Sequence, residues 1–147
     1  MDETMHDASP VRLQRGDFSV DAELSLLRAN RLNAGGLACF VGCARDFSNE
    51  HRVQHLDFDA YDSMALKVLH ALRHEAIAQF RLIDARIVHR TGFIAAGEQI
   101  VLIATAAEHR APALHACEWL IDELKQRTPI WKRETTPEGQ SWVTPRP

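Results

Sequence analysis

The sequence has little glycine, proline or cysteine and no long apolar run, and each shortage excludes a class of protein. Its 147 residues include 7 Gly, 6 Pro and 3 Cys. Such a composition argues against a low-complexity or disordered chain. Three cysteines, an odd number in a chain long enough to bury a core, do not predict a disulfide framework. The longest apolar run, residues 100–107, contains Thr105 and has the length of a strand, so no membrane-spanning helix is expected.

Positive charge is also scarce. Seventeen Lys and Arg against 20 Asp and Glu give a formal net charge of -3, which excludes a general nucleic-acid binder. The acidic first ten residues lack the features of a secretory signal, so we expect a reducing, cytoplasmic setting. We expect residues 1–10 to form a flexible lead-in and residues 11–147 a single domain.

Hydrophobic periodicity predicts an α+β protein. Strands are expected at residues 11–14, 37–42, 53–61, 83–91, 99–107, 130–135 and 141–144. A short helix is expected at 20–31, a long one from 62 to 80, and a second long one between Pro112 and Pro129. The apolar stripe of that last helix is expected to be Leu114, Cys117, Ile121 and Leu124. Residues 43–52 have the composition of an exposed loop, and Gly92 and Gly97 are expected to bracket a turn. This order predicts a mixed, mostly antiparallel sheet with two long helices and one short helix.

Motifs for metals, nucleotides and covalent nucleophiles are missing. His70 and His74 share a helix face but have no further ligand nearby in sequence, so we expect solvated side chains and no metal. Cys39 and Cys43 do not form a CxxC pair and are expected to be small, partly buried side chains. No GxSxG elbow and no glycine-rich phosphate loop occurs. We therefore expect no bound cofactor.

Cationic residues are placed at the boundaries of the expected elements. They are Arg45, His109, Arg110, Lys125, Lys132 and Arg133. Strand ends and helix starts commonly form binding sites, which predicts a pocket for an anionic, phosphorylated small molecule. The alternative is that Lys125 and Arg127 only complement the dipole of a helix C-terminus. The spacing alone leaves both interpretations open.

Several ordered motifs in the same regions resemble the large, catalytic subunit of molybdopterin synthase, over about residues 10 to 145. They are Phe40-Val-Gly42-Cys-Ala-Arg45-Asp46, His89-Arg90-Thr-Gly92, Ala107-Glu-His109-Arg110, Leu124-Lys125, Pro129-Ile-Trp131-Lys132-Arg133-Glu134 and Thr136-Pro137-Glu138-Gly139 with Trp142-Val143. Each motif alone is weak, and their combination is specific.

The resemblance implies an α/β-hammerhead-like core and a sulfur-transfer activity. In that family two large subunits form a central homodimer, and a small ubiquitin-like subunit docks at each end to give a heterotetramer. The small subunit carries a thiocarboxylate on its C-terminal Gly-Gly. Two of these sulfurs are transferred to cyclic pyranopterin monophosphate, which forms the dithiolene of molybdopterin. No metal or other cofactor is implied, and neither nucleic acid nor a membrane is an expected partner.

The resemblance also implies roles for individual residues. Lys125 and Lys132 correspond to the catalytic lysines and also contact substrate. Arg45, His109 and Arg110 are expected to contact the substrate phosphate and pterin, and to surround one cavity. Arg133 and Glu134 are expected at the pocket edge. Cys43 and Ala44 belong to the matched substrate-binding turn, where many relatives have a basic residue and a valine.

Two further expectations complete the prediction. The apolar run 100–107 and the hairpin bracketed by Gly92 and Gly97 should help to build the dimer. The alternative function is a non-catalytic binding module that keeps only the dimer and the partner-docking surface. A phosphate-binding hydrolase is disfavoured, because the sequence offers no water-activating metal site or carboxylate pair.

Overall fold

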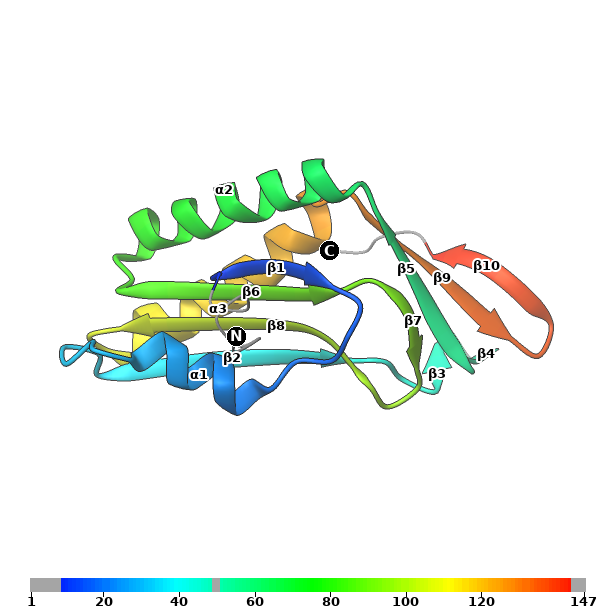
Figure 1. The fold of residues 1–147 in the computed structure, drawn as a ribbon, viewed down its shortest axis with the longest axis horizontal. Helices are drawn as coiled ribbons and strands as arrows, with labels where there is room; N and C mark the ends of the chain where they lie inside the picture. The colour runs from blue at the N-terminus through cyan, green and yellow to red at the C-terminus, as the bar shows by residue number, and fades with distance from the viewer. Residues whose placement is uncertain (1–8, 49–50, 144–147) are drawn as a thin grey trace, which may run out of the picture.

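The computed structural model describes residues 9–48 and 51–143, which form three helices, two four-stranded sheets and a short two-stranded sheet (Figure 1). The first sheet has the order β1 (Val11–Gln14), β6 (Asp84–Arg90), β8 (Gln99–Ala107), β2 (Gly36–Cys43). Only the β1–β6 pair in it is parallel. The second sheet is antiparallel, with the order β10 (Gly139–Val143), β9 (Ile130–Thr136), β5 (His55–Ala60), β7 (Gly92–Ala95). The predicted α+β class and mixed sheet are confirmed.

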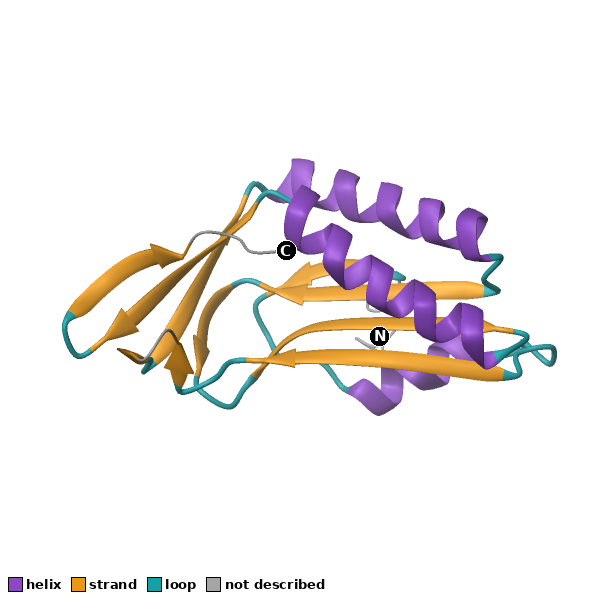
Figure 2. Cartoon of the chain, turned by 180° about the vertical axis from the view of Figure 1, so that it is seen from behind, coloured by secondary structure: helices purple, strands orange, loops and turns teal. Residues whose placement is uncertain are grey.

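Helices cover both faces of the first sheet. The long helices α2 (Asp62–Phe80) and α3 (Arg110–Arg127) lie side by side on one face, and the short helix α1 (Val20–Arg28) lies on the other (Figure 2). Side chains of β8 alternate between two cores, so Ile103 packs with α2 and α3 while Leu102 packs with α1. None of the three helices in the described part of the chain is long and apolar enough to span a membrane.

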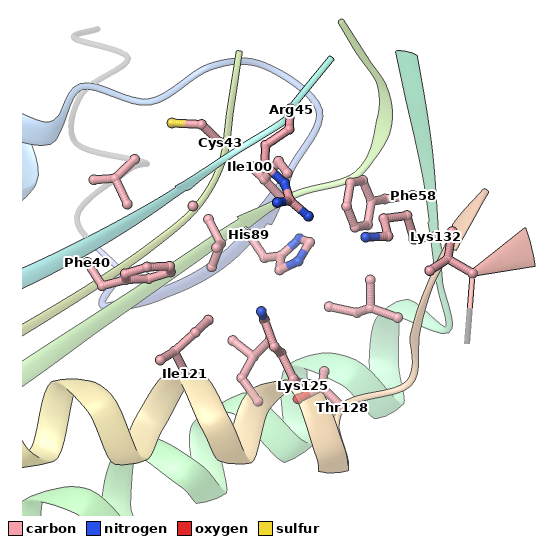
Figure 3. A pocket seen from close by; sticks show the side chains of 16 residues that line it. Phe40, Cys43, Arg45, Phe58, His89, Ile100, Ile121, Lys125, Thr128 and Lys132 are labelled. Carbon is pink, nitrogen blue, oxygen red and sulfur yellow. The ribbon is translucent and has the colours of Figure 1, made fainter. Parts of the chain in front are cut away.

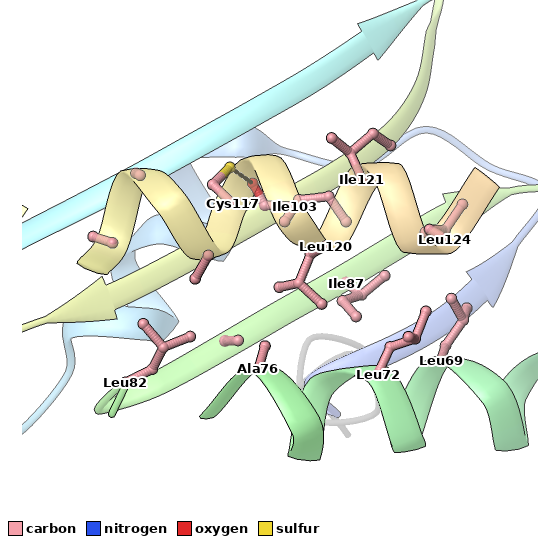
Figure 4. Packing of buried hydrophobic residues seen from close by; sticks show 14 of the residues in the cluster. Leu69, Leu72, Ala76, Leu82, Ile87, Ile103, Cys117, Leu120, Ile121 and Leu124 are labelled. Atoms are coloured by element: carbon pink, nitrogen blue, oxygen red, sulfur yellow. Dashed lines mark hydrogen bonds between the residues drawn. The ribbon is translucent and has the colours of Figure 1, made fainter. Parts of the chain in front are cut away.

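The main core lies between the first sheet and the two long helices (Figure 4). Its fully buried members include Leu69, Leu72, Ile87, Ile103 and Leu120. The predicted stripe of α3 is wrong at Leu114, which is 57% exposed. The buried face instead begins at Ala113 and Ala116, whose small side chains let the helix lie close to the sheet.

Two segments expected to lack strands contain them. Residues 43–52 include the short paired strands β3 (Phe47–Ser48) and β4 (His51–Arg52), and the stretch after Gly92 is the edge strand β7. The left-handed conformation of Gly92 (φ +81) favours glycine there, since other side chains rarely adopt it. In addition, α1 ends at Arg28 rather than Arg31, because Ala29 is extended and Asn30 is left-handed.

The polar residues of β6 are buried rather than solvated. The Asp84 carboxylate pairs with Arg31 and Arg73, and the Arg86 guanidinium donates to Glu23 at 3.0 Å. Partners on α1, in the segment after it and on α2 satisfy these charges, so Asp84 and Arg86 can be buried together with the rest of β6. The alternation in the sequence therefore indicated a strand but not its burial.

Strand β8 is paired on both edges, and its residues from Val101 to Ala107 are buried within the chain. The expectation that run 100–107 helps to build the dimer is therefore wrong for the side chains from Val101 to Ala107, since they already pack in the two cores. The part expected of the hairpin bracketed by Gly92 and Gly97 stays a prediction. Strand β2 is instead a terminal strand of its sheet. The lead-in expected at residues 1–10 lies mostly outside the described residues, and the single-domain organisation stays a prediction.

Candidate functional site

A cavity of about 560 Å³ opens where the two sheets meet the C-terminal end of α3. Its walls come from β2 and the segment after it, from β6 and β8, from the last turns of α3, and from β5, β9 and β10. Figure 3 shows the nitrogen ends of Arg45, His89, Lys125 and Lys132 pointing toward the same space. Elements distant in sequence therefore form this cavity together.

Three of the predicted cations line the cavity: Arg45, Lys125 and Lys132. Lys132 is half-buried on β9, and burial lowers its pKa below the usual lysine range. Glu134 partly opposes this shift, while the charges of Lys125 and Arg45 lower the pKa further. The three cations thus lie close enough to influence one another. No carboxylate is among the described lining residues, so the cavity is suited to an anionic ligand.

The remaining walls are largely apolar. Phe40, Phe58, Ile100, Ile121 and Leu124 contribute side chains around the cationic groups. Apolar walls with a few converging polar groups are typical of pockets that bind small organic molecules. The cavity can therefore hold a molecule that combines a ring system with one or more anionic groups.

His89 lines the cavity, although the sequence gave it no role beyond its place in a matched motif. Its imidazole is buried, and Nδ1 lies 2.6 Å from the Arg90 carbonyl oxygen. Burial lowers the pKa of His89 to about 4, and the bond to Arg90 opposes the shift only in part. The edge of the ring faces Phe58, with centroids 5.3 Å apart. A neutral histidine therefore forms part of the cavity wall.

Thr128 is a second lining residue that the sequence did not single out. It follows α3 directly, and its buried Oγ1 has no hydrogen-bond partner among the described residues. A buried hydroxyl without a partner costs free energy. Thr128 lines the cavity, so a bound ligand can offer its Oγ1 a hydrogen-bond partner.

Four of the predicted site residues lie at or beyond the edge of this cavity. Cys43 is exposed and lines it, whereas Ala44 is buried in the core of the second sheet. The Arg133 guanidinium contacts Asp57 at 3.3 Å and lies 5.3 Å from the centre of the Trp142 ring, away from the described lining. Glu134 is buried and acts on the cavity through the charge of Lys132.

His109 and Arg110 are not brought to this cavity within one chain. They are exposed at the start of α3, just beyond Ala107, which pairs with Gly36 at the first residue of β2. Arg45 follows the other end of β2, where Cys43 pairs with Gln99. Seven residue steps separate the two ends, or roughly 23 Å at the rise of a strand. The expectation that all three cations surround one cavity is therefore wrong for a single chain.

Among the described residues, the histidine pair on α2 has no further metal-ligating partner. His70 and His74 are exposed, as predicted. Within residues 9–48 and 51–143, no group of three or more His, Cys, Asp or Glu side chains is placed to hold a metal ion.

The fold and the cavity define an α+β protein with a cationic pocket whose described lining contains no carboxylate. The model of the MoaE protein family matches residues 13–127. The molybdopterin synthase catalytic subunit of Pyrococcus abyssi is 39% identical over 127 residues, which cover 86% of this chain and 84% of that relative. The chain belongs to the MoaE family.

Solved structures agree with this assignment. The molybdopterin biosynthesis MoaE protein from Burkholderia ambifaria is 41% identical with a TM-score of 0.81, covering 95% of this chain and 91% of that one. Molybdopterin synthase from Staphylococcus aureus is 26% identical with a TM-score of 0.87, covering 92% of this chain and 98% of that one.

Proposed function

We propose that this chain is the catalytic subunit of a molybdopterin synthase. It transfers two sulfurs from the thiocarboxylated C-terminus of a small ubiquitin-like partner to cyclic pyranopterin monophosphate, and so forms the dithiolene of molybdopterin. The observation that carries the proposal is the convergence of Arg45, Lys125 and Lys132 on one cavity with no carboxylate in its described lining. Its curated relatives named molybdopterin synthase catalytic subunit support the same function.

The chemistry of the substrates fits this cavity. A phosphate and a thiocarboxylate are both anions, and cations in a partly apolar cavity stabilise them more strongly than in water. The sulfur arrives already activated on the partner, so the enzyme needs to bind, orient and neutralise charge. Arg45 is a suitable phosphate ligand because of its planar, multidentate guanidinium, and the two lysines supply compact charges for the thiocarboxylate.

A second copy of the chain accounts for His109 and Arg110. Strand β2 is a terminal strand, and two-fold antiparallel pairing of two such edges brings the start of one beside the end of the other. In that arrangement His109 and Arg110 of one copy approach the Arg45 cavity of the other. Each copy in the homodimer thereby supplies residues to the site of the other. The heterotetramer adds one small subunit for each of the two completed sites.

The alternative, a non-catalytic module that only binds the partner, does not require the two lysines to face one cavity. Both lysines line the cavity and interact electrostatically. That arrangement favours the enzyme. A cytoplasmic location stays a prediction from the sequence.

The decisive experiment is reconstitution with a thiocarboxylated ubiquitin-like partner and cyclic pyranopterin monophosphate. We expect one dithiolene per substrate and conversion of two partner thiocarboxylates to carboxylates. Stable binding of the partner without any loss of its sulfur would instead support the binding module.

A further inference from the structure

The buried imidazole of His89 is the one described cavity group with an uncharged nitrogen base. The other side-chain nitrogen groups in the described lining belong to Arg45, Lys125 and Lys132, and that lining contains no carboxylate. His89 is also held rigidly, since its strand is paired on both sides, with Leu13 and with Val101. Its position in the wall is therefore fixed by the first sheet and not by a loop.

The tautomer of His89 follows from its hydrogen bond. A carbonyl oxygen can only accept, so Nδ1 carries the proton in the 2.6 Å contact with Arg90. In the neutral ring Nε2 then holds a lone pair. The contact of Nδ1 with Arg90 is the one side-chain hydrogen bond of His89 among the described residues, so Nε2 has no protein partner there, and the ring lines the cavity. A proton acceptor is thus available to whatever occupies the space between Arg45 and Lys125 (Figure 3).

The neighbouring Arg90 keeps this arrangement in place. Its guanidinium donates to the carbonyl oxygens of Gln99 at 2.9 Å and Arg15 at 3.1 Å. These bonds tie the end of β6 to β8 and to the segment after β1. The Arg90 carbonyl oxygen that accepts from His89 is consequently a fixed point, and the ring cannot easily turn to exchange its two nitrogens.

The proposed reaction requires a proton acceptor at one step. When the thiocarboxylate sulfur bonds to a substrate carbon, an oxygen substituent leaves that carbon with the electron pair of the broken carbon–oxygen bond, and the partner's acyl group remains on the sulfur. Release requires the acyl carbon–sulfur bond to break, and the acyl group must pass to the oxygen of water. The products are a carboxyl group on the partner and a thiol on the pterin, and nothing is oxidised or reduced.

We propose that His89 is a catalytic residue for this hydrolysis, a role that rests on the proposed function. Nε2 accepts a proton from the water as its oxygen adds to the acyl carbon, and the resulting imidazolium returns that proton to the departing sulfur. The ring is neutral again at the end of each transfer. Water is the only co-reactant.

The charges around the ring decide when this proton transfer is possible. Arg45 after β2, Lys125 on α3 and Lys132 on β9 face the cavity, whereas β5 and β8 contribute the apolar Phe58 and Ile100. In the empty cavity burial disfavours an imidazolium. The bound phosphate and the thiocarboxylate bring negative charge that offsets the cations. The transient imidazolium is therefore more stable in the loaded site than in the empty one.

The test is His89→Asn, which keeps an amide donor near the position of Nδ1 and removes the base at Nε2. The matched control is His70→Asn, an exposed imidazole on α2. Single turnover with the thiocarboxylated partner and the pterin monophosphate is followed by intact-mass measurement of the partner. We expect His89→Asn to attach the pterin and accumulate a covalent partner–pterin adduct, with release slowed about 10²–10⁴-fold. His70→Asn should release product at the wild-type rate.

Release by folded His89→Asn within threefold of wild type would overturn the proposal, as would loss of activity with no adduct. If His89→Asn does not fold, His89→Gln is used in its place, and the same accumulation of the covalent partner–pterin adduct is expected. In the wild type, adduct breakdown should slow at low pH as His89 takes up a proton, and this dependence should be absent from His89→Asn; the same pH profile in both proteins would contradict the proposal. If the wild-type protein transfers no sulfur at all, the proposed function fails, whereas normal turnover by both His89 variants removes only the role of His89.

Discussion

Lys125 and Lys132 face one cavity from two different elements, and the charge of Lys125 lowers the pKa of Lys132. The first lies in the last turn of α3 and the second on β9, with the chain reversing between them at Thr128 and Pro129. Burial is the larger cause of the lowered pKa, and proximity of the second ammonium adds to it. An incoming anion therefore meets two cations that repel one another, and it relieves that repulsion when it binds.

Lys125→Ala is expected to reduce single-turnover dithiolene formation about 10²–10³-fold at saturating partner, because it removes one electrostatic stabiliser from the cavity. Lys125→Arg should rescue poorly, since a guanidinium lacks the compact geometry of an ammonium. The matched control is Arg127→Ala. Arg127 lies in the same helical turn but pairs with Glu75 at 2.7 Å, outside the described lining. If Lys125→Ala turned over within threefold of wild type, Lys125 would only complement the dipole at the C-terminus of α3 and would have no catalytic role.

The pKa of Lys132 should rise when either neighbouring cation is removed. Lys125→Ala and Arg45→Ala each delete a charge that lowers this pKa. A group with a raised pKa keeps its proton to higher pH, so the titration of Lys132 should move upward in both variants. NMR titration of the labelled lysine Nζ measures the shift, with Lys67→Ala, on the exposed surface of α2, as control. An unchanged titration in both variants would contradict the proximity of the three cations.

Mixed assemblies test whether His109 and Arg110 act on the cavity of a second copy. Co-refolding Lys125→Ala chains with Arg110→Ala chains gives dimers in which one of the two sites has all of its residues, provided that Arg110 acts across the interface. We expect about a quarter of wild-type activity, because half of the dimers are mixed and half of their sites are intact. The control mixture of Lys125→Ala with Lys132→Ala should stay inactive, since both residues line the same cavity. No recovery in the first mixture would place Arg110 outside the site.

His89 should make the fold less stable as the pH falls. Its pKa is lowered to about 4 in the folded chain, against 6.5 for an ordinary histidine. Between these values the unfolded chain binds a proton that the folded chain does not, so stability rises with pH in that window. Lowering the pH from 7 to 5 should therefore cost about 2 kcal/mol through this residue. Urea unfolding at both pH values should show a smaller loss for His89→Asn than for wild type or His70→Asn, and equal losses would contradict the prediction.

Asp84→Ala should be strongly destabilising because it leaves Arg31 and Arg73 without their shared buried carboxylate. Breaking a buried ion pair by removing one partner costs about 3–5 kcal/mol, and the exposure of Arg31 places the expected loss near the lower end. Glu75→Ala removes the carboxylate of an exposed pair with Arg127 and should have a much smaller effect. Urea unfolding of the two variants at pH 7 compares them, and similar losses would contradict a buried network on β6.

Local sequence was sufficient for most elements of the fold. The period of apolar residues located α2, α3 and most strands, because each element must present one side to a core. The local pattern was insufficient where a strand depends on pairing with a segment distant in sequence. Strand β7, which begins at Gly92, is an example, because it forms by pairing with β5. Leu114 was misplaced because the choice of buried face on α3 depends on the sheet beneath Ala113 and Ala116.

The sequence by itself determined which cations the chain carries and that they stand at the ends of its elements. Only the tertiary structure decided which of them meet. The antiparallel pairing of β2 with β8 places Arg45 at one end of the sheet and Arg110 at the other, whereas the reversal after α3 joins Lys125 to Lys132. The tertiary structure also buries His89, which in the sequence is only one polar residue of an alternating strand, and burial keeps its imidazole neutral. Charge and burial at a site depend on neighbours distant in sequence, and the packing of the sheets determines those neighbours.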